Sequence, residues 1–311
     1  MQSIGLLDLP DEIKLNLKAE SNADYWDKVI DATGAISVAA AKREIVEIIK
    51  SNGESSFTSA RLDTFRYGGR YIKKIYKTSK KPSRYWQGAR IPLSYLRAIE
   101  DTIGVDYKHL ENSVEFYGLE TKSKIIPSLD DEYKLPIKFD PELTLALASV
   151  MWHDAKNNTF GFRSENQEQL DYLYNTFSNH FGEIPLGKES ISNHNLYIAQ
   201  KATTHIGFSY LDNHLDELDD YHHVAIVLGA CVARGIPIPK KIGGEGIAIS
   251  SLMETPMSRV RVSLEHLDIE YTSRVDKIII YKDSLGIISS LYDEIIECHP
   301  DSEQFLSGLN F

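Results

Sequence analysis

The 311-residue chain is acidic, with 34 Lys and Arg against 45 Asp and Glu and a formal net charge of −11. Its length suffices for two or three domains, and its hydrophobic content of 42% is ordinary for a globular protein. No apolar run approaches the roughly eighteen residues that cross a bilayer, and the N-terminus lacks the features of a secretory signal. Two cysteines without CxxC spacing support neither a disulfide framework nor a zinc site. We therefore expect a cytoplasmic protein without a membrane partner.

The charge is distributed unevenly along the chain. Residues 40–97 contain 14 basic and 4 acidic residues, a net +10, whereas residues 1–39 carry −4 and residues 98–311 carry −17. A concentrated positive segment in an acidic protein indicates a region that binds phosphate groups. The alternatives are an ordinary solvated basic surface, RNA or another acidic partner, because charge alone does not separate these cases.

Residues 1–36 form an N-terminal extension in which the periodic pattern is weak. Leu9–Leu17 alternates apolar and polar residues like a short strand, and Ala23–Thr33 has the character of a short helix. The pattern does not indicate a role for this segment.

A helical domain is expected at residues 37–115. Asn52-Gly53 ends its first helix in the manner of a helix C-cap, and the helices are rich in Lys and Arg on their polar faces. The expected helices before residue 78 are Ile36–Ile49, Ser59–Tyr67 and Arg70–Tyr76.

The stretch Thr78–Leu93 carries an aromatic anchor at Trp86, then Gly88, Arg90 and an Ile91-Pro92 turn, and it leads into a helix closed by Gly104-Val105-Asp106. This order resembles the helix-turn-helix of Cro- and repressor-type regulators. The resemblance implies that a short recognition helix enters the major groove of DNA. It covers about 45 residues, and the first helix of the pair departs from the usual alanine-rich pattern.

Several side chains around this recognition helix have the chemistry that DNA requires. Arg and Gln can each form two hydrogen bonds to guanine or adenine edges, and Lys and Arg bind phosphates. On Lys81–Gln87, three polar residues lie broadly on one side: Ser83, Arg84 and Gln87. The predicted DNA-binding residues are Lys73, Lys74, Lys77, Lys80, Lys81, Ser83, Arg84, Gln87 and Arg90.

Residues 116–140, which contain Pro127 and Pro136, indicate a linker.

Beyond the linker, two apolar runs about eighty residues apart have a similar pattern of apolar and small residues. Leu147–Ala155 contains the acid Asp154, and Val227–Gly235 carries Arg234 at the corresponding position. Both runs contain small residues that would let two helices approach closely: Ala148 and Ser149, and Gly229 and Ala230. Such a repeat indicates internal duplication.

Both runs resemble the signature of LAGLIDADG homing endonucleases, in which two such helices pack at a pseudo-two-fold axis. The resemblance covers about residues 138–311 and implies a duplicated αββαββα fold there. Together with the helical helix-turn-helix domain before it, the expected protein is α+β. Repeat 1 would span residues 141–216 and repeat 2 residues 217–311. The motif helices 143–154 and 223–234 should pack against each other. One chain then builds both halves, so a monomer suffices. The alternative for the first run is a buried core helix without this role.

The segments that flank the two runs alternate between helix and strand, as the resemblance requires. The expected elements are a strand in Thr159–Ser164, a helix at Gln167–Phe181 closed by Gly182, a strand at Gly246–Ser251, a helix at Pro256–Leu267, a strand at Tyr271–Tyr281 and a helix at Ser284–Ile296.

In the LAGLIDADG family each motif helix supplies one acid to a metal ion, and here only Asp154 is an acid. Metal-assisted phosphodiester cleavage uses oxygen ligands from both helices. Arg234 cannot ligate a metal, and its charge opposes a nearby cation. We therefore expect no catalytic residue, with Asp154 as the remnant acid and the single candidate metal ligand. No cofactor is expected unless endonuclease activity is retained, in which case Mg²⁺ is required. Arg234 would instead pair with Asp154.

The polar residues that precede the second run have a simpler explanation than catalysis. His222 and His223 are adjacent, so they face different directions on a helix and are awkward joint ligands. Asp216, Asp219 and Asp220 lie at the expected helix start, where the helix dipole favours negative charge.

These features favour a sequence-specific protein that binds double-stranded DNA and acts as a transcriptional regulator. WhiA-type regulators, which it resembles in make-up, use the same two folds. One alternative is an active or nicking metal-dependent LAGLIDADG endonuclease. Another is that the acidic C-terminal domain is a protein-interaction module, because a DNA-binding saddle is normally basic. The target site and the regulated process are not encoded in any pattern of the sequence.

Overall fold

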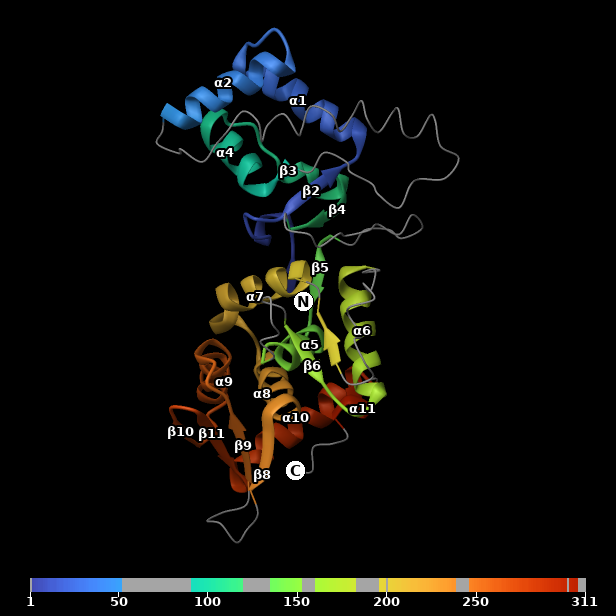
Figure 1. Cartoon of the computed structure of the whole chain (residues 1–311), viewed down its shortest axis with the longest axis vertical. Helices are drawn as coiled ribbons and strands as arrows, with labels where there is room; N and C mark the ends of the chain where they lie inside the picture. Colours follow the sequence, from blue (N-terminus) through green and yellow to red (C-terminus); the bar gives the residue numbers. More distant parts are fainter. Residues whose placement is uncertain are drawn as a thin grey trace. The chain divides into compact units, whose positions relative to one another are not determined.

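The computed structural model describes residues 2–51, 91–119, 135–152, 160–182, 196–199, 201–238, 246–300 and 302–306. The chain divides into two compact units (Figure 1). The N-terminal unit lies within Ile4–Pro136, and the C-terminal unit contains Ile137–Gly182 and Leu186–Phe311 together with Met1–Ser3. Within the described ranges, no helix has the length and apolarity to cross a membrane.

The N-terminal unit combines helices with a three-stranded sheet. Its helices, α1 (Ala19–Thr33), α2 (Val38–Ser51) and α4 (Leu93–Ile103), contact one another. Its sheet has the antiparallel order β3 (Ile91–Pro92), β2 (Lys14–Leu17) and β4 (Val114–Gly118). Two 3₁₀ turns complete the described part: η1 (Leu6–Asp8) and η2 (Lys108–Ser113).

Glycines end two of these helices in the left-handed region. Gly34 follows α1 with a φ of 65°, and Gly104 follows α4 with a φ of 71°, where residues with a Cβ are strained. The end of α4 at Gly104 confirms the expected helix boundary. Arg97, on α4, holds the segment around η1 by donating hydrogen bonds of 2.8 Å to the carbonyl oxygens of Leu7 and Leu9.

Two local predictions in this unit are corrected. Ile91–Pro92 is not a turn: both residues are extended and pair with Lys14 and Leu15 of β2, an option that Pro92 keeps because β3 is an edge strand. The strand expected over Leu9–Leu17 is confined to β2. The basic helices expected at Ser59–Tyr67 and Arg70–Tyr76, and the recognition helix at Lys81–Gln87, lie outside the described residues.

The first part of the C-terminal unit alternates helices with short strands. After β5 (Ile137–Phe139), which pairs with β1 (Gln2–Ile4), come α5 (Pro141–Val150), β6 (Gly161–Arg163), α6 (Gln167–Phe181), β7 (Leu196–Ile198) and α7 (Lys201–His214). β6 and β7 are antiparallel. The prediction of α6 is confirmed at both ends, since Gly182 follows it with a φ of 88°.

The second part has the order helix, strand, strand, helix, strand, strand, helix. After η3 (Leu215–Glu217) these are α8 (Asp220–Arg234), β8 (Gly235–Ile238), β9 (Gly246–Ser250), α9 (Glu254–His266), β10 (Tyr271–Arg274), β11 (Lys277–Tyr281) and, beyond η5 (Lys282–Ser284), α10 (Leu285–Cys298). A short α11 (Ser302–Leu306) follows. The single strand expected over Tyr271–Tyr281 is wrong, because a turn at Val275 and Asp276 divides it into the β10–β11 hairpin.

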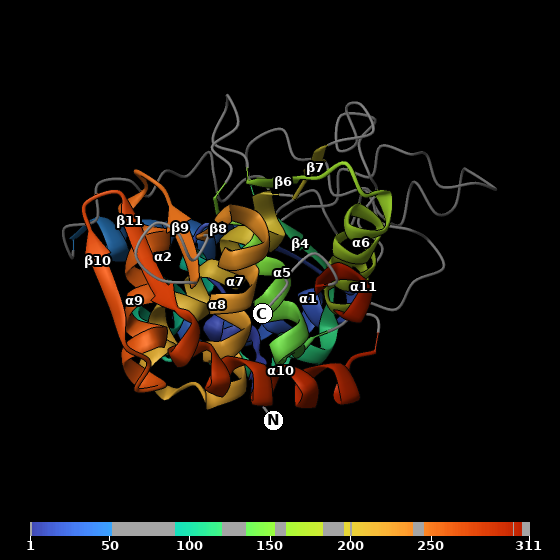
Figure 2. The same ribbon diagram turned by 90° about the horizontal axis from the view of Figure 1, so that it is seen from below.

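Helices α5 and α8 pack side by side at the centre of the C-terminal unit (Figures 1 and 2). Every residue of α5 from Leu143 to Val150 is buried. At the crossing, a Cβ built on Gly229 would lie 2.7 Å from the Cβ of Ala148 and 3.0 Å from the backbone nitrogen of Ser149. The expected packing of the two motif helices through small residues is therefore confirmed.

The first motif helix is shorter than predicted. α5 begins at Pro141 and ends at Val150, and Met151 and Trp152 form a turn. Its start is encoded locally: Asp140 is the N-cap, its carboxylate accepts the backbone N–H of Leu143 at 2.9 Å, and Pro141 occupies the first helical position.

Candidate nucleic-acid interface and the helix foot

The C-terminal ends of α5 and α8, here called the helix foot, are joined by a hydrogen bond. Arg234, the last residue of α8, donates from Nη2 to the carbonyl oxygen of Trp152 at 2.7 Å. Trp152 lies just beyond the end of α5, where carbonyl groups lack partners within the helix and the helix dipole is negative. The guanidinium therefore supplies a cation and a donor to the end of the neighbouring helix.

This arrangement does not fit a divalent metal ion. The guanidinium has no lone pair to offer, and a dication beside it would be repelled. Asp154, the predicted metal ligand, lies outside the described residues.

The opposite end of α8 is occupied by buried histidines with separate partners. Nδ1 of His222 lies 2.8 Å from Oγ1 of Thr144, and Nδ1 of His223 lies 3.1 Å from Oγ of Ser263. Asp219 is the N-cap and accepts the backbone N–H of His222 at 3.2 Å, as expected for an acid at a helix start. The two imidazoles do not converge on a common point.

Both histidines are held neutral by their surroundings. Burial lowers the pKa of His222, and burial together with the nearby His266 lowers the pKa of His223 to about 4. Ser263 donates its hydroxyl to the carbonyl oxygen of Arg259, so it accepts from Nδ1 of His223. Nε2 of His223 is buried and has no hydrogen-bond partner among the described residues, which suits a neutral ring.

The four-stranded sheet, in the order β10-β11-β9-β8, has one packed face and one outward face. Ile278 and Ile280 are fully buried and pair with Ile249 and Ile247, and strands β8 and β9 of the sheet contact α8. The residues that alternate with them lie on the other face. In register, the positions on this outward face are Thr272, Arg274, Lys277, Ile279, Tyr281, Gly246, Ala248, Ser250, Ile236 and Ile238, of which Gly246 and Ala248 are themselves buried.

The outward face carries positive charge and no negative charge at these described positions. Arg274 and Lys277 are register partners on the β10–β11 hairpin. The nearest acid along the chain, Asp276, belongs to the turn between these strands and not to the face. The negative charge of residues 98–311 is therefore absent from this surface as far as the structure describes it. A two-stranded ribbon with cations is a shape that the major groove of DNA can admit.

The other cations of interest are dispersed or lie outside the described residues. Lys201 begins α7. The predicted DNA-binding residues, Lys73, Lys74, Lys77, Lys80, Lys81, Ser83, Arg84, Gln87 and Arg90, all lie outside the described residues, and so do Lys188, Lys240 and Lys241.

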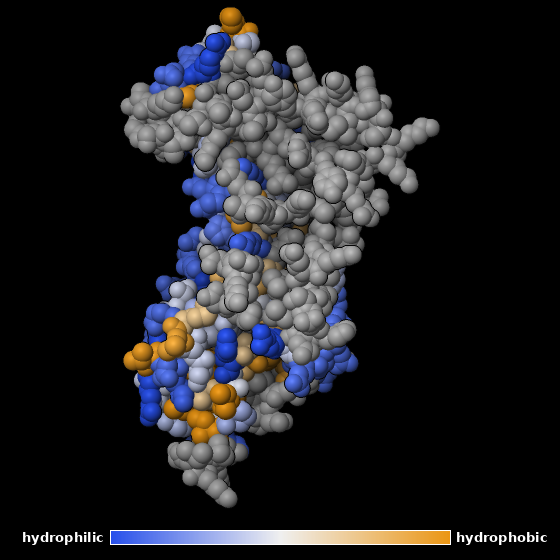
Figure 3. All heavy atoms as spheres, viewed as in Figure 1, coloured by the Kyte–Doolittle hydropathy of each residue, from blue (hydrophilic) through white to orange (hydrophobic). Residues whose placement is uncertain are grey.

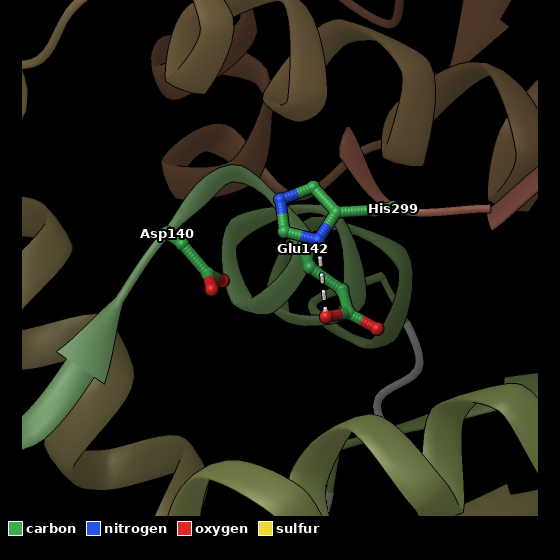
Figure 4. A group of neighbouring side chains, drawn as sticks. All are labelled: Asp140, Glu142 and His299. Atoms are coloured by element: carbon green, nitrogen blue, oxygen red, sulfur yellow. Dashed lines mark ion pairs between the residues drawn. The ribbon is translucent and has the colours of Figure 1, made fainter. Parts of the chain in front are cut away.

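A cluster that the sequence did not reveal surrounds the start of α5. Asp140 and Glu142 face His299, at the end of α10, and the ligand-forming atoms of these three residues lie within 4.8 Å of one another (Figure 4). Nε2 of His180, near the end of α6, lies 3.0 Å from Oδ1 of Asp140. Because about 160 residues separate Glu142 from His299, no motif spacing could have signalled this group.

Apolar side chains also reach the surface of the C-terminal unit (Figure 3). Ile236 is 59% exposed, on the outward face of the sheet, and Leu252 and Val275 are 88% and 89% exposed in connecting segments. These residues are candidates for contact with another macromolecule.

No protein-family model matches the sequence, and no curated protein is similar to it. Among solved structures, the chain is similar to mesophilic variants of the homing endonuclease I-DmoI, with a TM-score of 0.33, 11% identity, and coverage of 49% of this chain and 96% of that one. For I-DmoI in complex with DNA and Mn the TM-score is 0.30 and the identity 10%, over 50% of this chain and 95% of that one.

Proposed function

We propose that this chain is a LAGLIDADG-type protein that binds double-stranded DNA without cutting it and acts as a transcriptional regulator. The observation that carries the proposal is the outward face of the β10-β11-β9-β8 sheet. In a chain with a net charge of −11, this face presents Arg274 and Lys277 and no carboxylate at its described positions. A surface free of acids avoids repulsion of phosphates, and its cations can replace the counterions of DNA.

The helix foot supports binding without cleavage. The LAGLIDADG resemblance calls for an acid from each motif helix, and Arg234 stands at the second position with its guanidinium bonded to the Trp152 carbonyl. A metal-assisted reaction stabilises both the attacking and leaving oxygens through ions held by carboxylates. A pseudo-two-fold arrangement with one acid missing lacks the second half of that machinery.

Sequence selectivity is assigned to the N-terminal unit. The basis is the +10 charge of residues 40–97 and the resemblance of Thr78–Asp106 to a helix-turn-helix. Arg84 and Gln87 would contact base edges while the surrounding lysines contact phosphates. The C-terminal sheet would then extend the footprint along the duplex.

Fluorescence-anisotropy titrations of a random-sequence DNA duplex with the full chain test the role of the sheet. Arg274→Gln and Lys277→Gln should each weaken binding and reduce the slope of log affinity against log salt by about 1, as loss of one phosphate contact requires. Lys282→Gln is the matched control, since Lys282 is an exposed cation of the same unit outside the outward face. Equal effects of all three substitutions would mean that net charge, and not this face, governs binding.

A plasmid assay tests the absence of cleavage. The pure protein should leave supercoiled plasmid intact with Mg²⁺ or Mn²⁺ at all protein concentrations that saturate DNA. Metal-dependent linearisation or nicking that Asp154→Ala abolishes would establish the endonuclease alternative. Activity that persists in Asp154→Ala would instead indicate a contaminating nuclease.

The exposed apolar residues favour a second candidate, in which the acidic C-terminal unit binds another protein. Ile236 and Ile279 lie among the outward positions of the sheet, so that face is not uniformly polar. In this case Leu252→Ser and Val275→Ser should abolish a protein complex and leave DNA affinity unchanged. Loss of DNA affinity in Arg274→Gln together with intact protein association would favour the DNA-binding function of the sheet.

A further inference from the structure

The cluster at the start of α5 gathers two carboxylates and two imidazoles in a largely buried site. The side chain of Asp140 is 7% exposed, that of His180 is 6% exposed, and those of His299 and Glu142 are 16% and 19% exposed. These residues come from three helices that end or begin at this place: α5, α6 and α10. The cluster lies at the N-terminal end of α5, and the helix foot lies at the other end.

The spacing of Glu142 and His299 suits a shared metal ion better than a hydrogen bond. Oε2 of Glu142 and Nδ1 of His299 are 3.4 Å apart, beyond the usual range of a charge-assisted hydrogen bond. Zn²⁺ lies about 2.0–2.2 Å from nitrogen and oxygen ligands in tetrahedral geometry, which places two such ligands about 3.3 Å apart. One edge of a tetrahedral site is therefore already in place.

Asp140 is held as an ionised carboxylate beside this pair. Its Oδ1 accepts the backbone N–H of Leu143 and Nε2–H of His180, while its buried Oδ2 lies 2.7 Å from Nζ of Lys138. His180 also donates from Nδ1 to the carbonyl oxygen of Thr176 at 2.7 Å, so both ring nitrogens are donors and the ring is cationic. Carboxylates that bind metal ions are typically oriented by hydrogen bonds of this kind from neighbouring groups.

Neighbouring groups also determine the charge of Asp140 and the orientation of Glu142. Burial alone would raise the pKa of Asp140, but the hydrogen bond and charge of His180 and the ammonium of Lys138 keep that pKa below its usual range. Thr176 donates to Oε1 of Glu142 at 3.3 Å, which leaves Oε2 directed to His299. The side chain of Lys138 is 48% exposed, so its ammonium can move into solvent when another cation takes its place beside Oδ2.

We propose that Asp140, Glu142 and His299 form a binding site for a divalent transition-metal ion of the Zn²⁺ class, with His180 as the residue that positions Asp140. The mixed set of two oxygen donors and one imidazole nitrogen favours Zn²⁺, Co²⁺ or Ni²⁺ over Mg²⁺ or Ca²⁺. A water molecule would complete four-coordination. The bound ion ties the end of α10, and with it the C-terminal segment, to the start of α5. The proposal does not depend on DNA binding.

Three positive charges oppose binding of the ion. The N-terminal end of α5 has a positive dipole, which Asp140 and Glu142 offset, the cationic His180 lies beside Asp140, and the Lys138 ammonium competes for Oδ2. Removing this competing charge should therefore strengthen metal binding, whereas removing a ligand should weaken it. Opposite effects at neighbouring positions distinguish a metal site from a general loss of structure.

The test is a titration of the full-length, chelator-treated protein with Co²⁺, followed by the visible absorption of four-coordinate Co²⁺, and then displacement by Zn²⁺. One equivalent should bind. Glu142→Gln and His299→Asn should each weaken the affinity by about tenfold or more, and Lys138→Ala should increase it. His214→Asn is the matched control, because His214 forms a comparable His–Glu pair with Glu217 at 3.1 Å on the surface.

Thermal unfolding with and without Zn²⁺ provides a second readout, since an ion that binds the folded state raises the melting temperature. Far-UV circular dichroism identifies any variant that fails to fold. If a ligand variant does not fold, the Co²⁺ affinity of Lys138→Ala, a substitution of a half-exposed side chain, tests the metal site instead. The proposal would be overturned if Co²⁺ did not bind stoichiometrically, or if His299→Asn or Lys138→Ala left its affinity unchanged. The cluster would then be a set of ion pairs at the start of α5 without a metal ion.

Discussion

Gly229 of α8 faces Ala148 of α5 with no space between them for a side chain. A Cβ at position 229 would lie 2.7 Å from the Cβ of Ala148 and 2.9 Å from the carbonyl oxygen of Leu145. Both contacts are with atoms that cannot rotate away, because one is the first atom of a side chain and the other belongs to the backbone of a buried helix. The crossing of the two central helices therefore requires glycine at this position.

Gly229→Ala should lower the free energy of unfolding by about 1–3 kcal/mol, since overpacking forces the helices apart. Alanine has a higher helix propensity than glycine, so propensity alone would stabilise the variant. A net loss of stability must therefore come from the steric effect. Urea denaturation measures the change. The control is Gly286→Ala in α10, where a Cβ would meet nothing within 4 Å and the substitution should be neutral or stabilising. Equal stability of the two variants would contradict the close crossing.

Arg234→Gln should lower the free energy of unfolding by about 0.5–1 kcal/mol, because a solvent-exposed cation at a helix end contributes only modestly. A double-mutant cycle with Asp154→Asn then measures whether the two side chains also interact. A coupling above about 0.5 kcal/mol is expected if the guanidinium bridges Trp152 and Asp154. Strictly additive effects would show that Arg234 serves the Trp152 carbonyl alone, and an ion pair would be discarded as the replacement for the metal site.

Acid should destabilise the C-terminal unit through His223. Its surroundings are Ser263 and His266 from α9 and His222, Asp219 and Asp220 from α8 itself. Its pKa is about 4 in the folded chain, compared with about 6.5 when unfolded, so the unfolded chain binds the proton first. The free energy of unfolding therefore keeps its full value above pH ~6.5. It decreases as the pH falls toward ~4, by about 3 kcal/mol in total.

The measurement for His223 is urea denaturation at several pH values between 7 and 4 for the wild-type protein and for His223→Gln. The variant should be less stable at neutral pH and should approach the wild type as the pH falls. A profile of His223→Gln that runs parallel to that of the wild-type protein would mean that His223 does not control this part of the acid response.

Selective binding should depend on the N-terminal unit, as the basic segment and its helix-turn-helix resemblance predict. On a preferred site obtained by selection from a random duplex pool, Arg84→Ala should cost about 1–3 kcal/mol and relax the preference at one base position. Lys80→Ala should weaken binding to all duplexes evenly, because it removes a phosphate contact. Equal duplex affinity of the isolated fragment 138–311 and the full chain would refute this assignment.

Local signals in the sequence determined the boundaries of several elements. Gly104 and Gly182 ended α4 and α6 where expected, and Asp219 capped α8, because each of these effects depends on residues within one helical turn. The small residues Ala148 and Gly229 likewise predicted a close crossing, since glycine and alanine allow two helix backbones to come close together. The same local reasoning placed the end of the first motif helix too late, beyond Val150.

The tertiary structure decided the contacts between distant segments. β2 pairs with Ile91–Pro92 and with β4, so an expected turn became a strand, and Arg234 bonds to the Trp152 carbonyl at the foot of the neighbouring helix. Glu142 and His299 meet although they are far apart in the chain. Sequence alone determined the charge distribution, several of the helix ends and the paired apolar runs, because these depend on neighbouring residues. Which distant side chains meet depends on how the helices and strands pack, and no local pattern specifies that packing.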